Sequence, residues 1–267
     1  SRRQRQMCIR DRFGCAGNFK KDEDTLILDG GDILQGSAFA YYCRQVADSP
    51  EVIADIMNDC GYDYYTLGNH DFNYGLEYQA AYRSRNNGVC VCQNITDEAG
   101  NTLFPWKLHT MKNGLRVGIV GIVTDYVNIW EKEENLKGIH ITDPFEAAKN
   151  ALAQMKEQTD LTICIYHGGF ECDLESGETL SQTTENVGYR ICKELDFDIL
   201  LTGHQHMSVP GRDISGTYTV QPCDNAKEYQ YLEVTMTDHE KSIRSELRQS
   251  DAAKGTVLAD KYLSLIH

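Results

Sequence analysis

Residues 64–71 read YYTLGNHD, in which a short apolar run ends at Leu67 and a Gly-Asn-His-Asp tetrad follows. The run of aromatic and aliphatic residues predicts a buried strand, and the glycine after it predicts a sharp turn. That turn places Asn69 and His70 at the carboxyl end of the strand, which is where open α/β sheets bind their ligands. The stretch therefore predicts an α/β protein with a site at the strand ends.

Three further apolar runs end in the same way. Thr25–Asp29 leads into Gly30-Gly31-Asp32, and a run over 161–166 leads into His167. A run over 198–201 leads into Thr202-Gly203-His204-Gln205-His206. Because the carboxyl ends of parallel strands meet at one edge of a sheet, we expect these loops to converge on a single site.

The segments between these runs have the pattern of helices and buried strands. Helices are predicted from Ser49-Pro50 to Gly61, from Asp143-Pro144 onward, and over about 185–195. Further strands are predicted at 117–123, 218–221 and 229–235, and a charged, poorly patterned tail follows from about Asp238. Alternating strands and amphipathic helices indicate a single α/β domain.

Composition excludes several classes of protein. The chain has 267 residues, of which 41% are hydrophobic and 25% charged, so it is not a disordered chain. No apolar run approaches the length of a membrane-spanning helix, which takes about 18 residues or more. The net charge of −14 argues against a nucleic-acid polymer as partner. An anionic substrate would need local positive charge, and a metal centre supplies it.

Both ends of the chain differ in composition from the rest. Residues 1–12, SRRQRQMCIRDR, are basic and without strand or helix periodicity, and we interpret them as a non-native tract rather than as a basic arm for RNA or lipid headgroups. Residues 13–240 are expected to form the catalytic domain, and residues 241–267 a tail or the start of a missing C-terminal region. Both a cytoplasmic and an exported location stay open.

The residue types at the strand ends favour one chemistry. Taken singly, an Asp after two glycines is often a turn, and a His at a strand end is often only hydrogen-bonded. Four such residues after successive strands indicate a shared metal site instead. Imidazole with oxygen ligands suits Mn, Zn, Fe, Co or Ni. One carboxylate can bridge two ions about 3.5–4 Å apart, as in two-metal phosphoesterases.

Together the motifs resemble a known family. The Gly31-Asp32 pair, GNHD at 68–71, His167 and GHQH at 203–206 are similar to the motifs of the calcineurin-like metallophosphoesterase superfamily, in its 5′-nucleotidase group. The flanking stretches LGNHDFNYGL and ILLTGHQHM are most similar to the branch of 2′,3′-cyclic-nucleotide 2′-phosphodiesterases and 3′-nucleotidases. The resemblance covers about residues 24–237.

The resemblance implies a fold and a set of metal ligands. The fold is a four-layer α/β/β/α sandwich, here incomplete at the N-terminus, with two divalent metal ions. Asp32 would bridge the two ions. Asn69, His167 and His204 would complete one metal site, and His206 would belong to the other.

The resemblance also implies a catalytic histidine. His70 would be that residue, and Asn69 with His70 would contact the substrate phosphate. In nucleotidases of this group an aspartate three positions later partners the histidine, but Asn73 occupies that position here. Asp71 is expected to face elsewhere. Tyr74, like Tyr41 and Tyr42, is expected to pack at the rim rather than stack against substrate.

Two departures from the family bear on activity. The family begins with a strand ending in Asp-x-His, which supplies two ligands of the first metal, and no Asp-x-His occurs in this sequence. Full-length relatives also carry a C-terminal nucleotide-binding domain that is missing here. We expect hydrolysis of nucleotide phosphate esters by water attack at a dinuclear metal centre. The alternative is a truncated, weakly active or inactive remnant that binds nucleotide or metal. A zinc amide hydrolase is disfavoured because no HExxH motif is present.

Overall fold

The computed structural model describes residues 15–17, 19, 21–237, 241–251 and 262. The tract predicted at residues 1–12 lies outside these described residues, as does Asp238. In the described part of the chain, no helix has the length and apolarity needed to cross a membrane.

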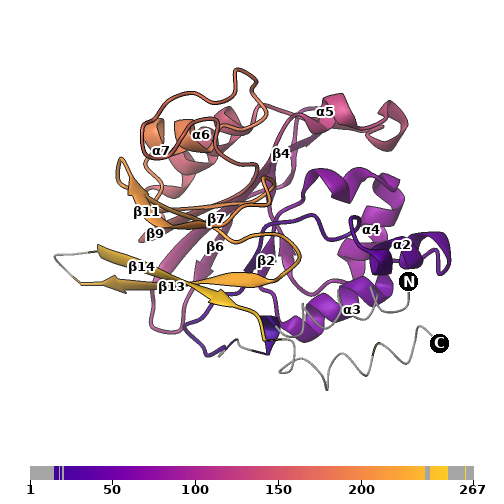
Figure 1. The fold of residues 1–267 in the computed structure, drawn as a ribbon, viewed down its shortest axis with the longest axis horizontal. Coiled ribbons are helices and arrows are strands. Elements are labelled where there is room, and N and C mark those ends of the chain that lie inside the picture. The colour runs from indigo at the N-terminus through magenta and orange to yellow at the C-terminus, as the bar shows by residue number, and fades with distance from the viewer. Residues whose placement is uncertain (1–14, 18, 20, 238–240, 252–261, 263–267) are drawn as a thin grey trace.

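Two sheets pack face to face, and helices cover their outer sides (Figure 1). The smaller sheet is parallel, in the order β1-β2-β3, with strands at Leu28–Asp29, Tyr64–Tyr65 and Val89–Cys90. The larger sheet has the order β11-β12-β10-β9-β7-β6. Its strands β6, β7, β9, β10, β11 and β12 span Lys107–Thr110, Arg116–Val123, Leu161–His167, Ile199–Thr202, Val209–Ile214 and Thr217–Gln221. The expected α/β/β/α arrangement is confirmed.

Side chains of the central strands β7 and β9 alternate between two apolar cores, one between the sheets and one beneath the outer helices. Successive side chains of a strand point to opposite faces. Ile119 and Ile163 face the core between the two sheets, whereas Val120 and Cys164 face the outer helices, and all four are buried. A fully buried aliphatic side chain contributes about 1.5–3 kcal/mol, so both faces of these strands stabilise the sandwich.

Two groups of helices lie on opposite sides of the sheets (Figure 1). On the smaller sheet, α2, α3 and α4 span Ala38–Gln45, Glu51–Cys60 and Gly75–Arg85. On the larger sheet, α6 and α7 span Pro144–Met155 and Gly188–Glu194. The predicted helix ends are confirmed at Gly61, which has a φ of 76° after α3, and at Asp143, whose side chain accepts from the Glu146 N–H.

Shorter elements complete the fold. Strands β4, β5 and β8 form an antiparallel sheet in the order β5-β4-β8, at Cys92–Asp97, Thr102–Phe104 and Ile139–Ile141. Helix α5 spans Val127–Trp130, and the 3₁₀ turns η1 and η2 span Asn69–Phe72 and Glu133–Asn135.

A hairpin follows the larger sheet. Strand β13, Glu228–Met236, pairs antiparallel with β14, Lys241–Gln249. Leu232, Val234 and Ile243 pack against the core between the sheets, which holds the hairpin in place. Strand β14 falls where a poorly patterned tail was expected, because only Ile243 and Leu247 mark its apolar face among polar residues.

Candidate metal centre

Four candidate ligands lie at the carboxyl ends of two pairs of parallel strands. Asp32 and Asn69 follow β1 and β2, which are neighbours in the smaller sheet. His167 is the last residue of β9, and His204 follows β10, its neighbour in the larger sheet. The structure brings these four side chains together where the two sheets meet.

Their ligand atoms are about one ligand–ligand spacing apart. Asn69 Oδ1 lies 3.1 Å from His167 Nε2 and 3.0 Å from His204 Nδ1. His167 Nε2 is also 3.2 Å from Asp32 Oδ2. Nitrogen and oxygen ligands lie about 2.0–2.2 Å from an ion such as Zn²⁺, so adjacent ligands of one ion are about 3 Å apart. Each of these three distances therefore matches the spacing of neighbouring ligands of one ion.

Hydrogen bonds on the far side of each imidazole set its protonation. His167 Nδ1 lies 2.6 Å from the carbonyl oxygen of Gly30, and His204 Nε2 lies 2.9 Å from Glu185 Oε1. Because a carbonyl or carboxylate oxygen only accepts, those two ring nitrogens carry the hydrogens. With a cation bound, the nitrogens that face Asn69 Oδ1 would present lone pairs to it. The donor set fits a cation, and its N and O atoms suit a first-row transition ion.

The amide of Asn69 is necessary to this fit. Within the described ranges, no three or more His, Cys, Asp or Glu side chains are by themselves grouped to hold a metal ion. The Asn69 oxygen stands between the two imidazoles and supplies the bridging contact. The centre therefore depends on two imidazoles, one carboxylate and one amide together.

Without a metal, Asp32 and His167 each favour the charged form of the other. Burial opposes charge on Asp32 and His167, but the adjacent imidazole lowers the pKa of Asp32 to about 2. The same contact with Asp32 raises the pKa of His167 in spite of its burial. Burial lowers the pKa of His204, partly against the effect of Glu185. The charges at this point of the molecule thus favour a positive group between Asp32 and His167.

A buried carboxylate joins the first two loops. Asp71 is 3% exposed and accepts four backbone hydrogen bonds of 2.8–2.9 Å. Oδ2 accepts from the N–H groups of Asp32 and Gly68, and Oδ1 accepts from those of Ile33 and Leu34. The four partners of the Asp71 carboxylate are backbone N–H groups and not the side chains of the candidate ligands. The sequence analysis did not identify its role, which is to hold the loop that carries Asp32.

Close backbone approach explains two of the glycines. A Cβ on Gly68 would lie 2.2 Å from Asp32 Oδ1, and a Cβ on Gly31 would lie 2.5 Å from the Gly68 nitrogen. Backbone strain is also concentrated here, because Asp32 and His204 have φ angles of 63° and 68°. Such conformations cost about 1–3 kcal/mol each and persist where the surroundings impose them.

The loops of the larger sheet are tied to one another by Gln205. Its side chain accepts from the Phe170 N–H at 2.9 Å and donates to the Phe170 carbonyl at 3.0 Å. The Gly203 N–H donates to the Gly168 carbonyl at 3.1 Å. These bonds fix His204 relative to His167, and the sequence analysis assigned no role to Gln205.

His70 lies next to the four ligands. Its backbone N–H donates to Asp32 Oδ1 at 2.8 Å, and its Nδ1 lies 2.8 Å from Asn73 Oδ1. An amide oxygen only accepts, so Nδ1 carries the hydrogen and Nε2 is left available. Asn73 is therefore a hydrogen-bond partner of His70.

His206 is not brought into this cluster. It is exposed, and the described part of the chain shows no hydrogen bond or ion pair to it. The pKa of Asp224 is lowered mainly by Lys227, and His206 lowers it to a lesser extent. Its assignment to a second metal stays a prediction.

One aromatic side chain, that of Trp130, stacks on a candidate ligand. Trp130 is 47% exposed and stacks on His204, with ring centroids 5.5 Å apart and an interplanar angle of 26°. The sequence analysis did not identify Trp130. Tyr74 packs edge-to-face on Tyr78 at 5.6 Å, which agrees with the expected packing role, whereas Tyr41 is exposed.

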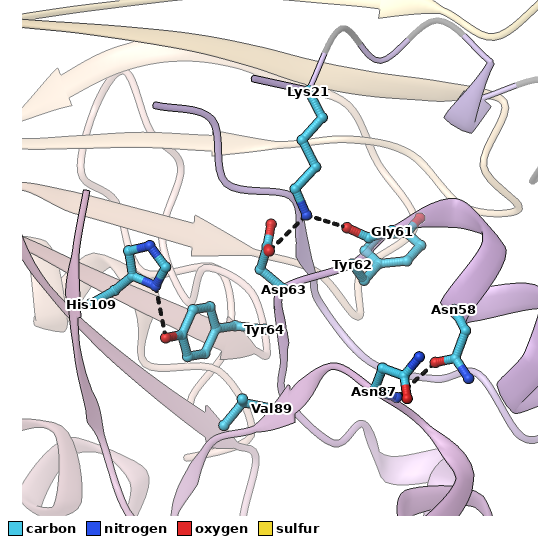
Figure 2. A pocket seen from close by; sticks show the side chains of 9 residues that line it. All are labelled: Lys21, Asn58, Gly61, Tyr62, Asp63, Tyr64, Asn87, Val89 and His109. Atoms are coloured by element: carbon cyan, nitrogen blue, oxygen red, sulfur yellow. Dashed lines mark hydrogen bonds and ion pairs between the residues drawn. The ribbon is translucent and has the colours of Figure 1, made fainter. Parts of the chain in front are cut away.

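A second hollow lies at the opposite end of the smaller sheet (Figure 2). Tyr64 and Val89, the first residues of β2 and β3, line it. Lys21 Nζ bonds to Asp63 Oδ1 at 2.7 Å and to the Gly61 carbonyl at 2.8 Å. Its charged groups pair with one another, and it is separate from the metal centre.

One protein family accounts for both the sandwich fold and the residues at its strand ends. A sequence model described as calcineurin-like phosphoesterase matches residues 9–208, and the chain belongs to this family. The family consists of hydrolases acting on phosphate esters that generally depend on divalent metal ions. The resemblance noted from the four motifs is thereby confirmed.

Nucleotide-directed enzymes are among the relatives. The chain is 28% identical over 216 residues to the trifunctional nucleotide phosphoesterase protein YfkN of Bacillus subtilis, covering 74% of this chain and 14% of that protein. It is 28% identical to a 2′,3′-cyclic-nucleotide 2′-phosphodiesterase/3′-nucleotidase of Yersinia enterocolitica, covering 76% and 32%. A solved candidate 5′-nucleotidase of Staphylococcus aureus, in complex with alpha-ketoglutarate, has a TM-score of 0.83 at 29% identity, covering 94% and 52%. The chain spans at most about half the length of these three proteins.

Proposed function

We propose that this chain hydrolyses phosphate esters of nucleotides at a centre that holds two divalent metal ions. The observation that carries the proposal is the convergence of Asp32 Oδ2, Asn69 Oδ1, His167 Nε2 and His204 Nδ1, in which neighbouring atoms lie 3.0–3.2 Å apart. The chain has a net charge of −14, which repels an anionic substrate. Binding of a phosphate ester therefore requires positive charge at the site.

Different residues of this chain are proposed to hold each of the two ions. Asp32, Asn69, His167 and His204 would hold one ion. Asp32, shared between the sites, and His206 would contribute to the other. Divalent ions at such a centre supply charge for the phosphate oxygens and lower the pKa of water.

His70 is the proposed proton donor. Water forms a new bond to phosphorus while the ester oxygen leaves, and that oxygen needs a proton. Asn73 occupies the Nδ1–H of His70, so the doubly protonated ring would donate from Nε2–H to the leaving oxygen and remain as the neutral Nδ1–H imidazole. The His70 N–H bond to Asp32 holds the histidine beside the candidate ligands, which supports the proposal that Asn69 and His70 contact the phosphate.

Nucleotides are proposed as substrates because of the relatives. Both curated relatives are named for action on nucleotides, one of them on 2′,3′-cyclic nucleotides. The exposed indole of Trp130 beside His204 offers an aromatic surface at the centre. 2′,3′-Cyclic AMP is accordingly the first substrate to test.

The test combines metal content with turnover. The chain is purified in Mn²⁺, its metal is measured by elemental analysis, and hydrolysis of 2′,3′-cyclic AMP is followed by chromatography. We expect about two ions per chain and a nucleoside monophosphate product. His70→Ala should abolish turnover with little change in metal content, whereas Asp32→Ala should lose both.

The alternative has its own result in the same experiment. The sequence contains no Asp-x-His, and the structure leaves His206 outside the cluster of four. About one ion or fewer without turnover would favour a truncated remnant that keeps one site. Full activity of His70→Ala would overturn the assigned mechanism.

A further inference from the structure

The hydrogen bond of His70 continues beyond Asn73 to a carboxylate. Asn73 Nδ2 donates to Glu131 Oε2 at 2.7 Å, while Asn73 Oδ1 lies 2.8 Å from His70 Nδ1. Glu131 comes from a distant segment, at the end of helix α5. Three side chains thus form one line of hydrogen bonds that ends at the candidate proton donor.

Glu131 determines which way the Asn73 amide points. A carboxylate only accepts hydrogen bonds, so the amide NH₂ of Asn73 must face Glu131. The amide oxygen is then turned to His70, where it can only accept from Nδ1–H. With the amide reversed, the NH₂ group would face the ring and favour the other tautomer. The choice of tautomer at His70 is therefore made at Glu131.

The carboxylate is itself held in place. Its Oε1 accepts from the Lys132 N–H at 2.8 Å and from Asn135 Nδ2 at 2.9 Å. Asn135 Nδ2 also lies 3.3 Å from the Asn73 carbonyl oxygen. Burial raises the pKa of Glu131, but the bonds from Asn73, Lys132 and Asn135 outweigh it and lower that pKa. The group is a fixed anion two hydrogen bonds from His70.

We propose that Glu131 is a positioning residue for His70, acting through Asn73 to hold a hydrogen on Nδ1, so that Nε2 is the nitrogen that gives up its proton at the centre. In the nucleotidases that this chain resembles, an aspartate is the direct partner of the histidine. Here Asn73 is that direct partner, and the carboxylate of Glu131 acts on His70 through Asn73. The inference rests on the proposed function only for the role of His70; the hydrogen-bond line itself is independent of turnover.

The first test reads the tautomer directly. ¹⁵N-labelled, metal-free protein is examined by long-range ¹H–¹⁵N NMR, which distinguishes an Nδ1–H from an Nε2–H imidazole. The wild type should show Nδ1–H at His70. Glu131→Ala and Asn73→Ala should each raise the fraction of Nε2–H. Should Glu131→Ala not fold, Glu131→Asp, whose shorter side chain draws back from Asn73, replaces it.

Glu134→Ala is the matched control. It removes the same charge from the same segment, but Glu134 is 76% exposed in its side chain and contacts only Lys132 among the described ion pairs, at 3.7 Å. Its His70 spectrum should equal that of the wild type. An unchanged spectrum in Glu131→Ala, or an equal change in Glu134→Ala, would overturn the proposal.

The second test uses hydrolysis of 2′,3′-cyclic AMP. Glu131→Ala should lower kcat about tenfold, as loss of outer partners of active-site groups commonly does, with KM nearly unchanged. In an Asn73→Ala background the same substitution should have no further effect on kcat. Additive effects of the two substitutions would contradict action through Asn73. If the wild type shows no turnover, the proposed function fails, while the NMR result still decides the role of Glu131.

Discussion

Asp71 Oδ2 accepts a 2.9 Å hydrogen bond from the backbone N–H of Asp32, which joins two loops 39 residues apart in the chain. The same carboxylate accepts from the N–H groups of Gly68, Ile33 and Leu34. Asp32 has a positive φ, which is an unfavourable backbone conformation for a residue other than glycine. The hydrogen bonds to Asp71 in the neighbouring loop stabilise that conformation.

Replacing Asp71 with Asn should destabilise the protein and weaken the metal centre. An amide keeps one oxygen, so two of the four N–H groups would face an NH₂ group instead. Unsatisfied buried donors cost about 1–3 kcal/mol each, so two of them predict a loss of about 2–6 kcal/mol in unfolding free energy. Urea unfolding in EDTA measures the stability, and elemental analysis measures the metal. Asp55→Asn, which removes only the surface ion pair with Arg85, should cost less than about 1 kcal/mol. Equal losses of unfolding free energy in the two variants would contradict the role of Asp71 in holding the loop that carries Asp32.

Gly68→Ala should disrupt the same contact sterically. The new Cβ would lie 2.2 Å from Asp32 Oδ1 and 2.6 Å from the Asp32 nitrogen, so the backbone has to move. Overpacking of this kind costs about 1–3 kcal/mol. Gly30→Ala is the matched control, because a Cβ there has no neighbour within 4 Å and its φ is not positive. Thermal unfolding of both variants decides the point: similar melting temperatures would show that the close approach is not maintained in solution.

The candidate ligands at the strand ends could be predicted from the sequence, but the residues that hold their loops in place could not. Asp32, Asn69, His167 and His204 follow apolar runs, and convergence follows from the geometry of parallel strands. Asp71 has no comparable signal, because its partners are backbone N–H groups brought close only by folding. The sequence motif marks its position without showing its contacts.

The carboxylates that orient the histidines were also missed. Glu131 lies in a segment for which no strand or helix was predicted, and it contacts Asn73 from 58 residues away in the chain. Glu185 lies at the start of the helix predicted over about 185–195, but the helical pattern does not show its contact with His204, 19 residues further along. Strand β14 carried a weak signal, an alternation of Ile243 and Leu247 with charged residues. Contacts between distant segments are what sequence patterns leave out, whereas local caps such as Asp143 are visible in them.

Stability at acid pH should depend on Asp160. The guanidinium of Arg116 lies 2.6 Å from Asp160 Oδ1 and holds the pKa of this carboxyl at about 2. An unfolded aspartate titrates near pH 4, so the ion pair stabilises the fold above about pH 4 and is lost as the pH falls through about 2. Because the pair is half-exposed, Asp160→Asn should cost at most about 1 kcal/mol at pH 5, with the difference from wild type shrinking toward pH 2. Asp196→Asn, at a more exposed ion pair with Lys156, should show a flat difference in urea titrations across this range. A pH-independent effect of Asp160→Asn would show that the carboxyl is not held ionised.

Glu185→Ala should weaken metal binding without removing any ligand. Glu185 Oε1 lies 2.9 Å from His204 Nε2, which keeps the hydrogen on that nitrogen and the lone pair of Nδ1 toward Asn69. Without the carboxylate, a proton on Nδ1 competes with the metal, and outer partners of this kind commonly change affinity about 10–100-fold. Competition titration with a coloured Zn²⁺ chelator measures the dissociation constant. Glu175→Ala, at an exposed position on the same long loop, should bind as the wild type does. If Glu185→Ala binds as tightly as that control, the stacked ring of Trp130 alone is sufficient to orient His204.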